Sequence, residues 1–97
     1  MKFKLIVKEE AEQDMTESFE YYEEQQSGLG AEFLDEVESY FNQLINYPEH
    51  YQKNEEIRTA VLHRFPHKII YEVEKEFVVV YAVFHSKRNP NELIKRF

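Results

Sequence analysis

The sequence predicts an α+β fold with the element order β-α-α-β-β-β, in which a helical hairpin packs on one face of a small, mainly antiparallel sheet. Two observations indicate this fold. Apolar residues follow a helical period through residues 9–46, and from residue 57 onward they alternate or run continuously, as in strands. The chain has 97 residues, of which 42% are hydrophobic. We therefore expect one domain, spanning residues 1–97, with a single modest core.

A short strand and a helix are expected at the start of the chain. In residues 2–8, a period of two places Phe3, Leu5 and Val7 on one face and Lys2, Lys4 and Lys8 on the other, as in a half-buried strand. Residues 9–26 carry an apolar stripe with helical spacing and begin with acidic residues, which favour the N-terminal end of a helix dipole. The stripe consists of Ala11, Met15, Phe19 and Tyr22.

A second helix is expected over residues 31–46, after a turn formed by residues 27–30. The turn contains Gly28 and Gly30, and a glycine readily takes the left-handed conformation that closes a helix. Pro48 ends the second helix, because the residue before a proline is pushed away from helical geometry. Such a short turn predicts an antiparallel helical hairpin. The apolar stripe of the second helix, expected in the core, is Leu34, Val37, Phe41, Leu44 and Ile45.

Three strands are expected in the second half of the chain, over residues 57–63, 67–73 and 77–85. The charged residues 74–76 form the hairpin between the last two strands. Residues 78–84 are almost continuously apolar, which is typical of a strand buried on both faces. The last strand should therefore be central in the sheet.

The composition and charge exclude several classes of protein. The chain has no cysteine, which rules out disulfides, thiol nucleophiles and Cys-ligated metals. It has neither a signal peptide pattern nor an apolar run long enough to cross a bilayer, so we expect a cytoplasmic protein that does not bind membranes. Residues 1–56 carry 4 lysines and 15 acidic residues, whereas residues 57–97 carry 8 basic and 4 acidic residues. The second half could therefore present one basic face, although the net charge of −7 disfavours a general nucleic-acid binder.

The histidines and serines give little support to a metal site or a hydrolase triad. His63 and His67 are four residues apart, but they lie in predicted strands around Pro66 rather than on one helical face. We expect no metal and no cofactor. His85 and Ser86 are neighbours in the last strand, so their side chains should point to opposite faces instead of toward each other.

Basic and polar residues gather on or just after the last three predicted strands. They are Arg58, Arg64, His67, Lys68, His85, Ser86, Lys87, Arg88 and Asn89. Strand ends that converge at one edge of a sheet can bring such side chains into one cleft. There, a guanidinium and an imidazole could stabilise charge and transfer a proton at a phosphodiester. The alternative interpretation is that these side chains are solvated or paired with glutamates.

Several short features follow one another along nearly the whole chain. They are the first strand leading into Glu9-Glu10-Ala11, Tyr21-Tyr22-Glu23-Glu24-Gln25, Gly28-Leu29-Gly30 with Phe33-Leu34, Tyr47-Pro48-Glu49, Arg58 followed by Phe65-Pro66, Ile70-Tyr71, and Val80-Tyr81-Ala82-Val83-Phe84-His85 before Arg88-Asn89-Pro90. In their order and spacing, they resemble the RelE/ParE superfamily of bacterial type II toxin–antitoxin toxins. The similarity is greatest to the ParE-like, plasmid-stabilisation branch.

The resemblance implies a small intracellular toxin that is encoded beside an antitoxin and neutralised by it. ParE-like members poison DNA gyrase, and no catalytic residues are established for them. In this interpretation, the basic C-terminal region binds the target. The target-binding candidates are Arg58, Arg64, Lys87, Arg88 and Asn89.

RelE-like members of the superfamily instead cut messenger RNA on the ribosome. The present sequence matches the residue pattern of these nucleases only in part. Lys68 falls where these nucleases place an arginine on the third strand, and Arg88 falls at the basic position after the last strand. Residues 91–97 contain neither the tyrosine nor the histidine that these nucleases use, although His85 could serve as the base. The catalytic set would then be Lys68, His85 and Arg88. A third alternative is a degenerate toxin that retains only antitoxin binding.

An antitoxin is expected to lay a helix or strand across exposed apolar surface of the toxin. Tyr21, Tyr47 and Tyr51 are the candidates for this surface. The acidic helical hairpin should also attract a basic antitoxin segment.

Overall fold

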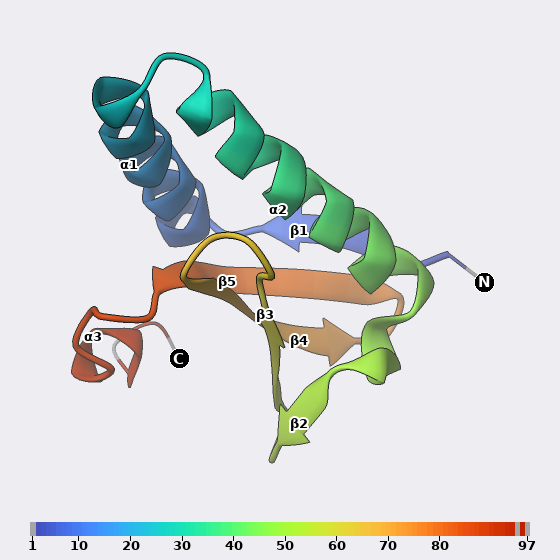
Figure 1. The fold of residues 1–97 in the computed structure, drawn as a ribbon. Helices are drawn as coiled ribbons and strands as arrows, with labels where there is room; N and C mark the ends of the chain where they lie inside the picture. Colours follow the sequence, from blue (N-terminus) through green and yellow to red (C-terminus); the bar gives the residue numbers. More distant parts are fainter. Residues whose placement is uncertain (1, 95, 97) are drawn as a thin grey trace.

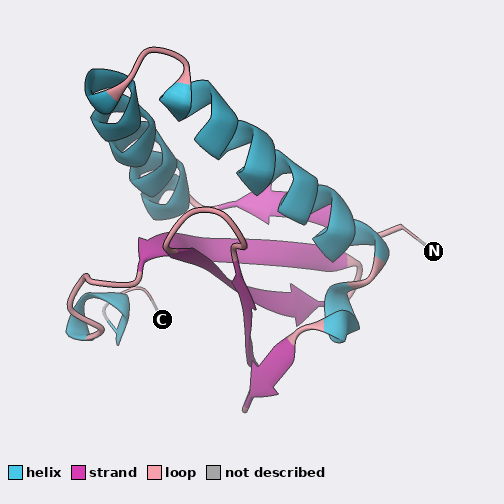
Figure 2. Ribbon diagram, in the orientation of Figure 1, coloured by secondary structure: helices cyan, strands magenta, loops and turns pink. Residues whose placement is uncertain are grey.

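The computed structural model describes residues 2–94 and 96, and within them the predicted α+β fold is confirmed (Figure 1). Five strands form one sheet in the order β1-β5-β4-β3-β2, in which β1 pairs parallel to β5 and the other neighbours pair antiparallel. The elements are β1 (Lys4–Val7), α1 (Glu9–Gln25), α2 (Leu29–Asn46), the 3-10 helix η1 (Pro48–His50), β2 (Gln52–Asn54), β3 (Ile57–Val61), β4 (His67–Glu74), β5 (Phe77–His85) and α3 (Asn91–Ile94). Figure 2 shows α1 and α2 as a hairpin on one side of the sheet.

Three short elements were not predicted from the sequence: η1, β2 and α3. The strand β2 is exposed at all three positions, so it lacks the alternation of apolar and polar residues that signals a strand. It forms the sheet edge by pairing with β3 across a turn in which Glu55 has a φ of 60°. The helix α3 spans four residues and has no buried residue, so no apolar stripe marks it.

The two glycines of the helical hairpin have different roles. Gly28 has a φ of 88°, which is the left-handed conformation expected of a turn residue. Gly30 instead lies inside α2, which begins at Leu29, and a Cβ added there would lie 2.6 Å from the backbone oxygen of Phe19. The N–H of Gly30 donates a 2.8 Å hydrogen bond to the Glu23 carboxylate. Gly30 therefore permits close packing of the helices and is not part of the turn.

The main core lies between the hairpin and the sheet. Two residues of the predicted α2 stripe, Leu34 and Ile45, are only half-buried. From the same helix, Val37, Phe41 and Leu44 of the stripe are buried, as is Phe33, which lies outside it. They belong to one apolar cluster with buried residues of β3, β4 and β5. On α1 only Ala11 and Asp14 are buried, whereas the other residues of the predicted stripe are half-buried.

A second, smaller core lies on the opposite face of the sheet. It contains Ile70, Ala82 and Phe84, with Ile57 and Leu93 packed beside them. The strand β5 lies between β1 and β4 and contributes buried residues to both cores, so the prediction that it is central is confirmed. Within residues 2–94 and 96, no helix is both long enough and apolar enough to cross a membrane.

Candidate functional site

Two loops meet at the end of the sheet where β3 and β5 finish and β4 starts. The backbone N–H and the hydroxyl of Ser86 both donate to the carbonyl oxygen of Pro66, at 2.9 and 2.6 Å. This joins the loop of residues 62–66 to the loop of residues 86–90. We call residues 62–68 and 85–90 the basic sheet end. It contains all but one of the basic and polar residues that the sequence grouped together.

The exception is Arg58, which lies at the other end of the sheet. Because β3 and β4 are antiparallel, Arg58 is opposite Tyr71, well away from His67 at the start of β4. The Nη1 of Arg58 donates to the carbonyl oxygens of Tyr51 and Glu49, at 2.9 and 3.3 Å. In this position Arg58 holds the segment around η1.

Within the basic sheet end, Lys68 and His85 point to opposite faces. The register pairs His67 with His85 and Lys68 with Phe84, and paired residues share a face. The rings of His67 and His85 are 4.9 Å apart and lie on the helix side, where His67 meets Ser18 of α1. Lys68 lies on the other side, with its Nζ 6.0 Å from the centre of the Phe84 ring.

The arginines of the basic sheet end are engaged with acidic residues. Arg64 forms an ion pair with Glu32 of α2. The carboxylate of Glu36, also on α2, accepts hydrogen bonds from the backbone N–H groups of Arg64 and Phe65, at 2.9 and 3.2 Å. Lys87 and Asn89 are exposed, and no ion pair with Lys87 is present among the described residues.

Asp14 connects α1 to the chain after β5. Its carboxylate is 5% exposed and accepts hydrogen bonds from the backbone N–H of Val83 at 3.1 Å and from Arg88 Nη1 at 2.9 Å. It also accepts two hydrogen bonds from Arg96, at 2.7 and 3.0 Å. Arg88 pairs in addition with Glu92. The sequence interpretation missed Asp14 and Arg96, although a carboxylate one turn after Ala11 on the buried side of α1 was an available signal.

A cavity of about 310 Å³ opens between α1 and the basic sheet end. Asp14, Ser18, His67, His85 and Arg88 are among the residues that line it. Burial, together with the charge of His85 and opposed by Asp14, lowers the pKa of His67 to about 4, so its imidazole is neutral at pH 7. Its Nε2 lies 3.2 Å from the Ser18 hydroxyl, whereas its Nδ1 has no hydrogen-bond partner in the described part of the chain.

The cavity can accept a small polar group, with hydrogen bonds from an imidazole and a guanidinium. His85 Nδ1 accepts a 3.0 Å hydrogen bond from the N–H of Lys87, which orients the imidazole ring. Among residues 2–94 and 96, no three histidine, aspartate or glutamate side chains are grouped in a way that could hold a metal ion.

Comparisons with known proteins agree with the geometry of the fold. Residues 5–90 match a family model described as "ParE toxin of type II toxin-antitoxin system, parDE". No curated protein matches the sequence. A solved structure described as the chromosomal ParDE TA system from P. aeruginosa is similar, with a TM-score of 0.76 and 12% sequence identity, over 86% of this chain and 95% of that chain. At this identity, the likeness to the solved structure shows a shared fold.

Proposed function

We propose that this chain, which belongs to the ParE toxin family of type II toxin–antitoxin systems, inhibits growth by binding DNA gyrase in the cytoplasm and is neutralised by a cognate antitoxin. The observation that carries the proposal is the family match over residues 5–90. The acidic hairpin and the basic sheet end give the molecule two oppositely charged surfaces, which suits two different partners.

The basic sheet end is the surface that we assign to the target. Lys87 and Asn89 are exposed on the loop after β5, and Arg88 lies between them with a third of its side chain exposed. Arg64 lies on the adjoining loop and is also exposed. Arg58 supports the fold from the other end of the sheet, so we assign it no direct target contact.

A supercoiling assay with purified gyrase tests the proposal. The wild-type protein should inhibit supercoiling or trap a cleaved DNA complex, and Lys87→Glu should weaken this effect about tenfold or more. Lys53→Glu is the matched control, because Lys53 is exposed on β2 and receives the same change of charge. Unchanged supercoiling with folded wild-type protein, and no cleaved complex, would refute gyrase as the target.

The helical hairpin is the surface that we assign to the antitoxin. Between the helices lies an apolar groove of about 360 Å³, lined by Glu12, Met15, Thr16, Phe19 and Leu34. Most carboxylates of α1 and α2 are exposed, and Glu12 lines the groove itself. A basic, amphipathic antitoxin segment fits this combination of an apolar groove and negative charge. Coexpression with the product of the neighbouring reading frame should restore growth, and failure to do so would contradict the assignment.

The nuclease alternative has one supporting observation, because His85 and Arg88 line the same cavity. Against it, Lys68 projects from the other face of the sheet and cannot join them there. A translating system with a defined message distinguishes the two functions. Cleavage by the wild type that is lost in His85→Ala would establish the nuclease. A chain that neither cleaves message nor arrests growth would be a degenerate toxin.

A further inference from the structure

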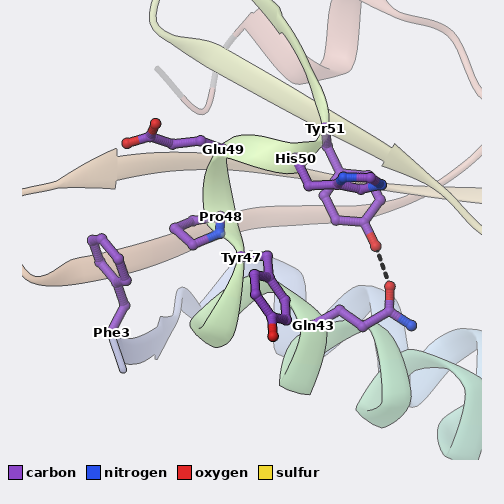
Figure 3. A pocket seen from close by; sticks show the side chains of 7 residues that line it. All are labelled: Phe3, Gln43, Tyr47, Pro48, Glu49, His50 and Tyr51. Carbon is purple, nitrogen blue, oxygen red and sulfur yellow. Dashed lines mark hydrogen bonds between the residues drawn. The ribbon is translucent and has the colours of Figure 1, made fainter. Parts of the chain in front are cut away.

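A third hollow, of about 550 Å³, lies at the C-terminal end of α2, away from the basic sheet end. Its lining includes the rings of Phe3, Tyr47 and Tyr51, together with Pro48 and Glu49 (Figure 3). In this view Tyr47 lies between Phe3 and Tyr51, so aromatic surface extends along the hollow. Tyr47 is 71% exposed. A large aromatic side chain that is exposed beside a hollow is a common feature of binding surfaces.

The backbone around the hollow is held in place by polar contacts from behind. The hydroxyl of Tyr71, which is fully buried, donates a 2.6 Å hydrogen bond to the carbonyl oxygen of Pro48. Arg58 donates to the carbonyl oxygens of Tyr51 and Glu49. The N–H of Phe3 donates to the carbonyl oxygen of Ile45 at 2.8 Å. The hollow is therefore preformed, so a ligand can bind without first ordering this part of the backbone, and the entropic cost of binding is lower.

Three features of the hollow favour a positively charged ligand. The last turn of α2 has no basic residue, so no cationic side chain of that helix offsets the negative end of its dipole, although His50 of η1 also lines the hollow. Glu49 is exposed, and no ion pair to its carboxylate is present among residues 2–94 and 96. The aromatic rings present faces that attract cations. Arg58 does not line the hollow, and its Nη1 is occupied by the two backbone carbonyls.

We propose that this hollow is a docking site for a protein segment that inserts an arginine side chain. The aliphatic part of the arginine would pack on Pro48 and Tyr47, and its guanidinium would lie over an aromatic ring near the Glu49 carboxylate. Nucleic acid does not fit, because the carboxylate and the helix end repel phosphate. The proposal does not depend on gyrase being the target, since the hollow is remote from the basic sheet end.

The binding of a single arginine can be measured by NMR. In a titration of the 15N-labelled full-length protein, N-acetyl-arginine N-methylamide should cause saturable shifts at the amides of residues 47–51. The citrulline analogue, which has nearly the same shape without the charge, should bind at least fivefold more weakly. Equal affinity for the two probes, or no saturable shift at these residues, would overturn the proposal.

Variants at exposed positions identify the contacts without disturbing the core. Tyr47→Ala and Glu49→Gln should each weaken binding of the arginine probe at least fivefold. Tyr21→Ala and Glu38→Gln, which alter an exposed ring and an exposed carboxylate on the hairpin, should leave the affinity unchanged. Well-dispersed spectra of all four variants would verify that they fold. An unchanged affinity in Glu49→Gln would contradict the assigned charge preference.

Discussion

Replacing Asp14 with asparagine should destabilise the protein by about 2–3 kcal/mol. The carboxylate is 5% exposed and accepts four hydrogen bonds, from Val83, Arg88 and Arg96. Asparagine has nearly the same shape and retains one acceptor, so the hydrogen bond from the Val83 N–H can survive. The substitution removes the negative charge, however, and leaves two guanidinium groups without their buried partner.

The magnitude follows from how exposed the two arginines are. Removing one partner of a fully buried ion pair costs about 3–5 kcal/mol, because the remaining charge is left uncompensated. The Arg96 side chain is 12% exposed and approaches that case, whereas the Arg88 side chain is 34% exposed and keeps its pair with Glu92. The expected loss therefore lies below that range. With an unfolding entropy of about 0.2 kcal/mol/K for a domain of this size, the melting temperature should fall by about 10–15 °C.

Urea unfolding followed by circular dichroism at pH 7 measures this loss. The control is Glu92→Gln, which removes only the exposed pair to Arg88 and should cost no more than about 0.5 kcal/mol. Adding Arg96→Met to Asp14→Asn should cost little more, because both changes remove the same interaction. A stability of Asp14→Asn within about 0.5 kcal/mol of wild type would refute the reasoning.

Two further predictions concern stability. Between pH 7 and pH 5 the titration of His67 should lower the free energy of unfolding by about 2 kcal/mol. The pKa of His67 is about 4 in the folded state, where the side chain faces Asp14 and His85, and 6.5 in the unfolded chain. In this pH range, therefore, the unfolded chain gains a proton on His67 and the folded protein does not. Urea titrations of His67→Gln should not show this part of the loss, and an equal pH dependence in the variant would contradict the assignment. Gly30→Ala should cost about 2–3 kcal/mol, since its Cβ would collide with the backbone of α1. In the same assay Gly28→Ala should cost about 1 kcal/mol, because only its positive φ is unfavourable there. Equal losses in the two glycine variants would argue against the close packing.

The elements that were predicted correctly are those that bury apolar residues in a recognisable pattern, either a continuous run or a regular spacing. The continuous apolar run of β5 and the stripe of α2 follow directly from the faces that they bury. The strand β2 and the helix α3 bury no residue of their own, so their sequences carry no such signal. The position of Arg58 could have been predicted, because the start of β3 must lie beside the end of β4 in an antiparallel pair.

The connection made by Asp14 could not be predicted from local sequence patterns. Its partners Val83, Arg88 and Arg96 lie 69 to 82 positions further along the chain. Only the three-dimensional arrangement brings them to α1. The sequence therefore identified the charged residues of the basic sheet end, but not which of them the fold itself neutralises.

This neutralisation changes how the two surfaces should behave in solution. At the basic sheet end, Arg64 and Arg88 are paired with carboxylates, which leaves Lys87 as an exposed cation with no ion pair among the described residues. The hairpin, by contrast, keeps most of its carboxylates exposed. Long-range attraction should therefore be stronger at the hairpin, and salt should screen it more. In stopped-flow or surface-binding measurements between about 50 and 500 mM salt, the association rate with the antitoxin should fall more steeply than that with the target. The opposite order would show that the basic sheet end, despite its internal pairs, dominates the electrostatic field of the molecule.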